Sequence, residues 1–327
     1  MAKTTNSCMH CQNPLYINIR HHRQRLCLEH YIRWFQDKTD RTTQKYGMFD
    51  HAARILVAVS GGKDSLALWD ALLRRGFAAE GLFIDLGIGG GDGFSARSLA
   101  AIRLFLEKEH PAAPLHVVSL RESCGATLPE LARGEARGRK KTCALCGLVK
   151  RHIMNDFPLK NGFTALATGH TLDDEAAILL RNVIHWECGY LGRQAPVLEE
   201  SPGFIRRVKP FVRFFESEIA AYVQARGIGP VTVECPWSAK ASTNRYKELL
   251  QRHEDDAPGA SLHFYQQFLD ARATGRVLFP PQAAQQLAPC RSCGTPTNTG
   301  DSCAYCRMLE RRTARGRRTV RSDTFDS

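Results

Sequence analysis

The chain has 327 residues, of which 43% are hydrophobic and 24% are charged, so it has room for one large core with small modules attached. No apolar run reaches the roughly 20 residues of a membrane helix, and the first residues lack a signal peptide. We therefore expect a cytoplasmic protein that does not contact membranes. The net charge of +12 favours an anionic partner, and nucleic acid is the simplest one.

Cysteine motifs lie near both ends of the chain. The first, C-x2-C-x15-C-x2-H, consists of Cys8, Cys11, Cys27 and His30. The second, C-x2-C-x9-C-x2-C, consists of Cys290, Cys293, Cys303 and Cys306. Two turns that each supply two soft ligands are typical of tetrahedral zinc, and a reducing compartment argues against disulfides. The sequence predicts a zinc module at each end. Tyr31, Trp34 and Phe35 follow the first motif at helical spacing and are expected to anchor it to the core, with stacking on RNA bases as the alternative.

The next elements lie within RILVAVSGGKDSLALWDALLRR. Residues 55–59 are apolar without alternation, which predicts a strand buried on both faces of a parallel sheet. Leu66, Trp69 and Leu72 then recur at helical spacing. The loop between strand and helix consists of Ser60, Gly61, Gly62, Lys63, Asp64 and Ser65. Glycines before a helix N-terminus favour phosphate binding, but the loop lacks the G-x-x-x-x-G-K-[ST] pattern of Walker-type NTPases.

The middle of the chain carries a basic run and a C-x-x-C pair. Residues 133–141, RGEARGRKK, contain five basic side chains, and residues 307–321 contain seven arginines. Either segment could be a solvated surface, but the composition favours phosphate contacts. Cys143 and Cys146 follow the central run, and a redox dithiol or a persulfide carrier competes with a metal centre there. The cysteines at 124 and 188 have no partner by spacing, so we expect buried thiols.

Residues 165–184, ALATGHTLDDEAAILLRNVI, predict another strand, loop and helix. Thr171 with Asp174 three residues later is typical of a helix N-terminal capping box. Gly169 allows close backbone approach, and the acidic residues 173–175 follow a strand's carboxyl end, where open α/β sheets bind ligands. Further on, residues 206–227 predict a strand, a turn and a helix, and residues 238–256 and 261–277 predict amphipathic helices.

The SGGKDS loop resembles the PP-loop of adenine nucleotide α-hydrolase-like enzymes, which cleave ATP between the α and β phosphates and transfer AMP to a substrate oxygen. GLFIDLGI at 81–88 and the segment 165–184 are similar to further parts of that nucleotide site. The resemblance implies an α/β fold, with a Rossmann-like parallel-sheet PP-loop domain flanked by the two zinc modules. It also implies that ATP contacts the loop residues 60–65 together with Ile84, Gly169 and Asp174, and that Asp64 and Asp174 hold Mg²⁺.

Within this superfamily the chain is similar to tRNA 2-thiolation enzymes of the TtcA/TtuA type, and the terminal zinc modules favour the TtuA-like group. In these enzymes a central C-x-x-C joins a later cysteine to hold a 4Fe-4S cluster. The matching residues here are Cys143, Cys146 and Cys235. The resemblance further implies that Lys150 acts in catalysis beside Lys63, Asp64 and Asp174, although a lysine on an exposed helix face is the alternative.

The implied activity is ATP-dependent tRNA thiolation, with 2-thiouridine as the expected product. The implied partners are tRNA, a sulfur-carrier protein or sulfide donor, and a second copy of the chain. Three alternatives remain: thiolation of a small molecule, an ATP pyrophosphatase that forms an amide or lysidine, and an RNA-binding module without catalysis. We expect four regions: a zinc module with a linker helix at 1–48, the PP-loop domain at 49–240, a helical extension at 241–285, and a zinc module with a basic tail at 286–327.

Overall fold

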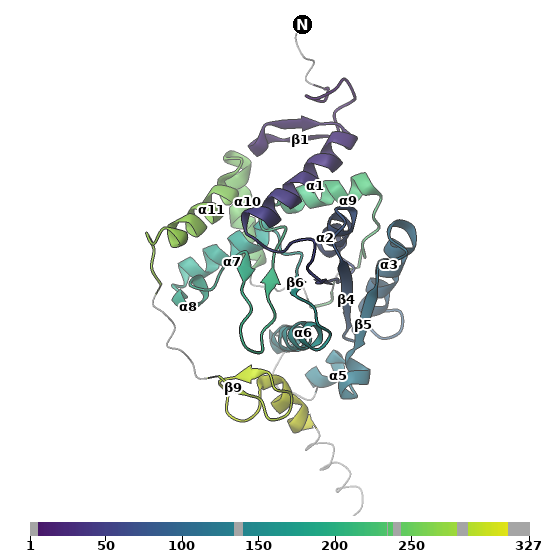
Figure 1. The fold of residues 1–327 in the computed structure, drawn as a ribbon, viewed down its shortest axis with the longest axis vertical. Coiled ribbons are helices and arrows are strands. Elements are labelled where there is room, and N and C mark those ends of the chain that lie inside the picture. The colour runs from purple at the N-terminus through teal and green to yellow at the C-terminus, as the bar shows by residue number, and fades with distance from the viewer. Residues whose placement is uncertain (1–5, 134–139, 234, 238–242, 280–286, 313–327) are drawn as a thin grey trace, which may run out of the picture.

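The computed structural model describes residues 6–133, 140–233, 235–237, 243–279 and 287–312. Helices surround a central sheet, and the two cysteine motifs lie at opposite ends of the long axis (Figure 1). Among the described residues, no helix combines the length and apolarity that a membrane crossing needs.

The central sheet has six strands in the order β5-β4-β3-β6-β8-β7. All neighbouring strands run parallel except the edge pair β7 and β8. The strands are β3 (Ile55–Ala58), β4 (Ala79–Asp85), β5 (Leu115–Ser119), β6 (Ala165–Ala167), β7 (Val197–Leu198) and β8 (Arg207–Val208). Ile55 pairs with Ala79 on one side and with Ala165 on the other, which fixes the register. The predicted α/β class and mostly parallel sheet are confirmed.

Helices cover both faces of the sheet because the buried strands are apolar on both sides. Ile55 and Val57 of β3 pack in one cluster with α2 and α9, whereas Leu56 belongs to a cluster on the opposite face that includes Met154 of α6. The larger helices are α1 (Leu28–Lys45), α2 (Lys63–Arg74), α3 (Phe94–Glu109), α6 (Lys140–Lys160), α7 (Leu172–Ile184), α9 (Glu216–Arg226), α10 (Asn244–Asp256) and α11 (Ala260–Ala273). The shorter helices are α4 (Leu120–Cys124), α5 (Leu128–Arg133) and α8 (Cys188–Leu191).

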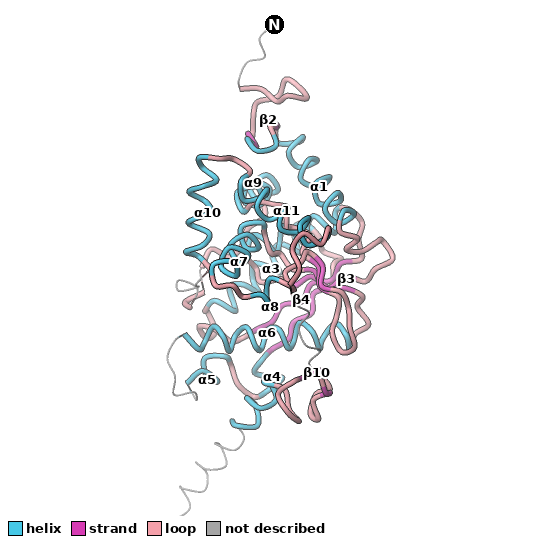
Figure 2. Tube along the Cα trace, turned by 90° about the vertical axis from the view of Figure 1, so that its left-hand side faces the viewer, coloured by secondary structure: helices cyan, strands magenta, loops and turns pink. Residues whose placement is uncertain are grey.

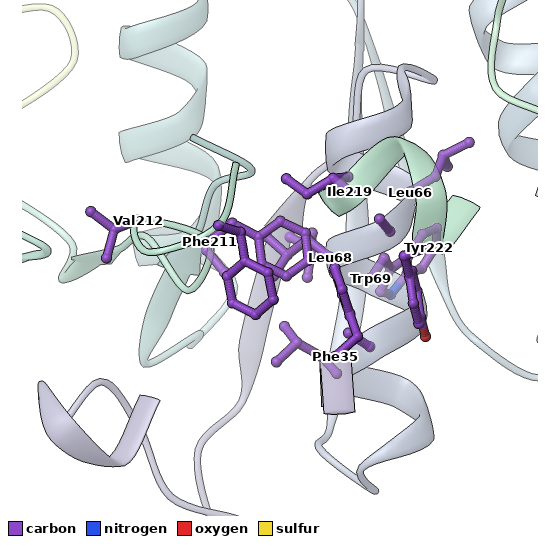
Figure 3. Packing of buried hydrophobic residues seen from close by; sticks show 14 of the residues in the cluster. Phe35, Leu66, Leu68, Trp69, Phe211, Val212, Ile219 and Tyr222 are labelled. Carbon is purple, nitrogen blue, oxygen red and sulfur yellow. The ribbon is translucent and has the colours of Figure 1, made fainter. Parts of the chain in front are cut away.

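Helix α1 joins the N-terminal module to the main core. This module contains β1 (Ile17–Ile19), the 3-10 turn η1 (Arg20–His22) and β2 (Gln24–Leu26). Phe35 of α1 is buried and stacks on Tyr222 of α9 with ring centroids 3.9 Å apart, beside Trp69 and Phe211 (Figure 3). Tyr31 is also buried, and the half-buried Trp34 packs against the same core, so the predicted aromatic anchor is confirmed.

The C-terminal module, with β9 (Ala288–Pro289) and β10 (Pro296–Thr297), packs near α5 and α6 (Figure 2). Tyr305 stacks on His152 of α6 with centroids 3.9 Å apart and ring planes inclined by 13°. The Arg312 guanidinium donates hydrogen bonds to the carbonyl oxygens of Cys124 and Gly125. The module therefore packs against α6, the helix that carries the central cysteine pair.

Two sequence predictions about cysteines and charge have different outcomes. Cys188 is exposed and Cys124 is half-buried, so the predicted burial is wrong for Cys188, which lies on the short surface helix α8. The predicted phosphate contacts of the basic segments fall mainly on residues 134–139 and 313–327, which lie outside the described residues.

Candidate active site

The SGGKDS loop lies where the chain order of the sheet reverses. Strand β3 is followed by α2 and then by β4 on one side, whereas the next central strand on the other side is β6. The loops after β3 and β6 therefore lie together at the carboxyl ends of the strands, the usual ligand position in open α/β sheets, and we call this place the crevice. Ile84 lies near the carboxyl end of β4, the neighbouring strand.

Serine hydroxyls hold the loop in a compact turn before α2. Ser65 Oγ accepts a hydrogen bond from the Ser60 backbone N–H at 3.1 Å and donates one to the Gly62 carbonyl at 3.0 Å. Gly61 has φ of +79°, and a Cβ there would lie 2.7 Å from the Ser98 carbonyl oxygen. Only glycine fits this conformation without strain, and the following helix begins at Lys63 with amide groups available for an anion.

Gly169, in the loop between β6 and α7, lies directly against the start of α2. A Cβ on Gly169 would lie 3.0 Å from the Asp64 carbonyl carbon and 3.1 Å from the Ser65 backbone nitrogen. The predicted close approach of backbone at this glycine is confirmed. The contact joins the two loops into one site.

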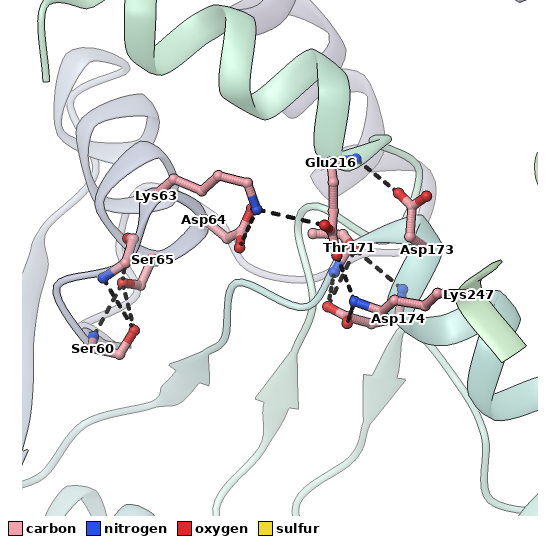
Figure 4. A network of polar contacts seen from close by, with 10 residues as sticks. Ser60, Lys63, Asp64, Ser65, Thr171, Asp173, Asp174, Glu216 and Lys247 are labelled. Atoms are coloured by element: carbon pink, nitrogen blue, oxygen red, sulfur yellow. Dashed lines mark hydrogen bonds and ion pairs between the residues drawn. The ribbon is translucent and has the colours of Figure 1, made fainter. Parts of the chain in front are cut away.

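A network of charged side chains spans the crevice (Figure 4). Lys63 Nζ lies 3.0 Å from both carboxylate oxygens of Asp64 and 3.7 Å from Glu216 Oε2. Lys247 Nζ lies 2.5 Å from Asp174 Oδ1 and 2.5 Å from Glu216 Oε1. Glu216 therefore bridges the two lysines, and three carboxylates share two ammonium groups.

Asp174 has two separate functions, one for each oxygen. Its Oδ2 accepts from the Thr171 N–H at 3.0 Å while Thr171 Oγ1 accepts from the Asp174 N–H at 3.2 Å, so the predicted capping box is confirmed. Its Oδ1 faces Lys247. The cap fixes the side-chain orientation, which leaves one carboxylate oxygen directed into the site.

Burial and neighbouring charges separate the acidities of the carboxylates. Burial raises the pKa of Asp64 despite the adjacent Lys63, and burial raises the pKa of Asp173 to about 6. Burial alone would also raise the pKa of Asp174, but Lys247 outweighs it and lowers that pKa. Asp174 is therefore ionised at neutral pH, which suits a ligand for a cation.

The sequence reasoning missed Glu216 and Lys247. Both lie on predicted helices, but nothing local distinguishes them from the charged residues around them, because only the tertiary fold brings α9 and α10 to this crevice. Glu175, in contrast, was included among the acidic residues of the predicted ligand site, but the structure gives it another position. It is buried and pairs with Lys209 at 2.8 Å, so it is a structural residue beside the two acids of the site.

The central cysteines lie on α6 and on the segment after α9. Cys143 is exposed and Cys146, one turn later, is half-buried. The Cys143 thiol donates to the Trp237 carbonyl oxygen at 3.5 Å, which brings the half-buried Cys235 beside this pair. Burial raises the pKa of Cys146, opposed by the charge of Lys150 on the next turn.

This cysteine region is joined to the SGGKDS loop through the backbone. The Val231 N–H donates to the Gly61 carbonyl oxygen at 2.8 Å, four residues before Cys235. The segment that carries Cys235 therefore contacts the SGGKDS loop at Val231.

The two terminal motifs each converge on a point. The ligand atoms of Cys8, Cys11, Cys27 and His30 all lie within 4.8 Å of one another, and so do those of the four C-terminal cysteines. His30 directs Nδ1 at the three sulfurs, at 3.2 to 3.6 Å. Burial alone would raise the pKa of Cys8 and of Cys290, but backbone N–H groups outweigh it and lower each to about 6. One thiol of each set is thus made more acidic, whereas burial raises the pKa of Cys303, so a bound metal would displace the protons of the remaining thiols.

A mostly parallel sheet with SGGKDS at its switch point and a metal-ligand set at each end defines a PP-loop ATPase-like protein. No protein-family model matches the chain. It is 44% identical over 303 residues, 93% of this chain and 91% of the relative, to the tRNA-5-methyluridine(54) 2-sulfurtransferase of Thermus thermophilus. It is 38% identical to the enzyme of the same name from Pyrococcus horikoshii, over 92% of this chain and 93% of that one.

The chain therefore belongs to the family of PP-loop tRNA 2-thiolation sulfurtransferases. Among solved structures, the U34-tRNA thiolase NcsA from Methanococcus maripaludis, described with its [4Fe-4S] cluster, has the same fold. The TM-score is 0.73 at 20% identity, covering 94% of this chain and 97% of that one. The resemblance inferred from the sequence motifs is confirmed at the level of family and enzyme class.

Proposed function

We propose that this chain thiolates tRNA in an ATP-dependent reaction at the 2-position of 5-methyluridine 54. The family supplies the reaction class, and the names of the relatives that cover nearly the whole chain supply the base and position. One observation carries the mechanism: the SGGKDS loop is joined by the Val231–Gly61 hydrogen bond to the segment with Cys235. The loop proposed to bind ATP and the segment that carries Cys235 are therefore neighbours in the fold.

The charged groups around the loop suit ATP binding and adenylation of the tRNA base. Amide groups at the start of α2 and the ammonium of Lys63 suit the β and γ phosphates of ATP, and Asp64 with Asp174 suits the Mg²⁺ that accompanies it. The base carbonyl oxygen attacks the α phosphorus, the bond to the β phosphate breaks, and pyrophosphate leaves. Sulfur then forms a bond to the activated carbon, the carbon–oxygen bond breaks, and AMP leaves with the oxygen.

The three central cysteines suit an iron–sulfur cluster. Thiolates are the ligands that such clusters prefer, and the contact of Cys143 with Trp237 brings the segment of Cys235 beside the central pair. Cys143, Cys146 and Cys235 would hold the cluster, and the cluster would supply iron that is able to bind the sulfide to be transferred. Lys150, one turn after Cys146, supplies positive charge beside the thiolates.

Zinc is the metal that suits both terminal ligand sets, because four sulfur or imidazole ligands converge in each and these are the ligands of structural zinc. We infer that the modules and the basic segments orient tRNA, whose unstacked bases can enter a protein pocket. A sulfur-carrier protein or free sulfide would supply the sulfur.

Anaerobic purification, followed by iron, sulfide and zinc analysis of wild type and Cys235→Ala, tests the cofactor assignment. We expect about four irons, four sulfides and two zincs per chain, with iron lost and zinc kept in the variant. Cys188→Ala, an exposed cysteine outside the site, is the matched control and should keep its iron. Zinc alone in wild type would favour the persulfide or redox alternative. Thiolation by an iron-free Cys143→Ala protein would overturn the cluster's role.

A further inference from the structure

Lys247 contacts both acidic residues that face the crevice from its far side. Its Nζ lies 2.5 Å from Asp174 Oδ1 and 2.5 Å from Glu216 Oε1, while Lys63 lies nearer to Asp64. The ammonium therefore bridges carboxylates from α7 and α9, which is the position that a shared divalent cation would take.

The surroundings of Lys247 indicate that this pairing positions the start of α10. None of the α10 side chains is buried, and all thirteen belong to the described part of the chain. The helix packs on α7, where Tyr246 forms a polar contact with His185 at 3.0 Å. Tyr246, Lys247 and Leu250 form the half-buried side of this helix, so polar contacts on that side contribute to its position, and the two carboxylates and Lys247 hold each other in place.

The ion pairs of Lys247 with Asp174 and Glu216 affect cation binding because they neutralise these carboxylates. With Lys247 present, Asp64, Asp174 and Glu216 share two ammonium groups. Without it, Asp174 and Glu216 would face each other with Lys63 as the remaining cation nearby, 3.7 Å from Glu216. Carboxylate oxygens in that arrangement attract a divalent cation, and the ammonium competes with it for the same oxygens.

We propose that Lys247 is a positioning residue that acts as a built-in counter-ion: it holds Asp174 and Glu216 together and keeps free divalent cations out of the site until they arrive with ATP. This inference rests on the proposed function, which makes the crevice an ATP site. The phosphates of MgATP add ligands that free Mg²⁺ lacks, so the nucleotide complex overcomes a competition that the free ion does not.

Titration of the full-length protein with Mn²⁺, followed by electron paramagnetic resonance without nucleotide, tests the inference. We expect Lys247→Met to bind at the crevice at least tenfold more tightly than wild type, about 1.4 kcal/mol. Lys247→Gln should behave like Lys247→Met, and Lys247→Arg should keep the weak binding of wild type. Arg245→Met removes an exposed positive charge from the same helix and is the matched control.

Equal Mn²⁺ affinity of wild type and both neutral variants would overturn the inference. So would an equal gain in Arg245→Met, because it would show a general effect of charge. Thermal unfolding of each variant identifies any variant that fails to fold. If Lys247→Met does not fold, Lys247→Gln takes its place in the comparison. A separate ATP titration of wild type distinguishes the two proposals: absence of ATP binding contradicts the proposed function and leaves the Mn²⁺ comparison unaffected.

Discussion

The ion pair between Lys38 and Glu218 provides a quantitative test of how α1 is attached to the catalytic core. Lys38 Nζ lies 2.7 Å and 3.0 Å from the two Glu218 oxygens, and the side chains are 5% and 3% exposed. His21 Nε2 lies 3.1 Å from Glu218 Oε1, and the Phe215 N–H donates to Oε2 at 2.9 Å. Glu218 therefore joins the N-terminal module to the first turn of α9, two residues from Glu216 of the active site.

Glu218→Gln keeps the side-chain shape but removes the negative charge. Burial alone would raise the pKa of Glu218, yet Lys38 and His21 lower it to about 2 from an ordinary 4.5. That difference corresponds to about 3 kcal/mol of folding free energy. Because the folded pKa is depressed, this stability is present above pH 4.5 and is lost as the pH falls toward 2. We expect Glu218→Gln to cost about 3–5 kcal/mol at pH 7, since Lys38 would be left buried and unpaired.

Urea unfolding of the zinc-loaded protein measures these costs. The double variant Lys38→Met/Glu218→Gln should be more stable than Glu218→Gln alone, because it leaves no isolated buried charge. Glu29→Gln is the control: it removes an exposed pair with Arg33, whose side chains are 64% and 71% exposed, and should change stability by less than about 0.5 kcal/mol. A cost of Glu218→Gln similar to that of the control would refute the reasoning.

Three further predictions concern the crevice and the metal sites. Gly169→Ala should weaken ATP binding about tenfold in calorimetry, because its Cβ would lie 3.0 Å from loop backbone and overpacking costs about 1–3 kcal/mol. Gly229→Ala, with open space around it, is the control and should bind ATP normally. Equal ATP affinities of Gly169→Ala and wild type would contradict the assignment. Burial raises the pKa of Asp173 to about 6 from 3.8, so the stability of wild type should fall as the pH rises through this range. In urea unfolding at pH 8, Asp173→Asn should be about 1–2 kcal/mol more stable than wild type. If the variant and wild type have the same pH profile, the result would argue against the burial effect. Cys290→Ser should lose about one zinc per chain in metal analysis and lower the melting temperature, whereas Cys188→Ser should do neither; full zinc in the first variant would remove this cysteine from the ligand set.

The sequence allowed prediction of those parts of the site that depend on local patterns. The apolar run at 55–59, the capping pair Thr171 and Asp174, and Gly169 each require a particular backbone geometry, and the structure has that geometry at each position. The terminal motifs were predictable for the same reason, since pairs of ligands close in sequence must lie close in space.

Glu216 and Lys247 were not predictable, because their function depends on where α9 and α10 pack. A charged residue on an amphipathic helix has the same local pattern whether it faces solvent or an active site. Burial of Cys188 was predicted from the usual behaviour of free cysteine, but the short helix α8 exposes it. The expected domain boundaries and the roles of individual site residues remain predictions.

Nucleoside mass spectrometry of tRNA tests the central claim most directly. The anaerobically purified protein would be incubated with unthiolated tRNA, MgATP and sulfide, beside a Lys63→Met variant and a reaction without ATP. We predict 2-thio-5-methyluridine at position 54 together with AMP and pyrophosphate in the complete reaction, and none of these three products in the other two. AMP and pyrophosphate that form in the complete reaction with no thiolated nucleoside, and that form equally in a further reaction without tRNA, would contradict the account and favour a small-molecule substrate.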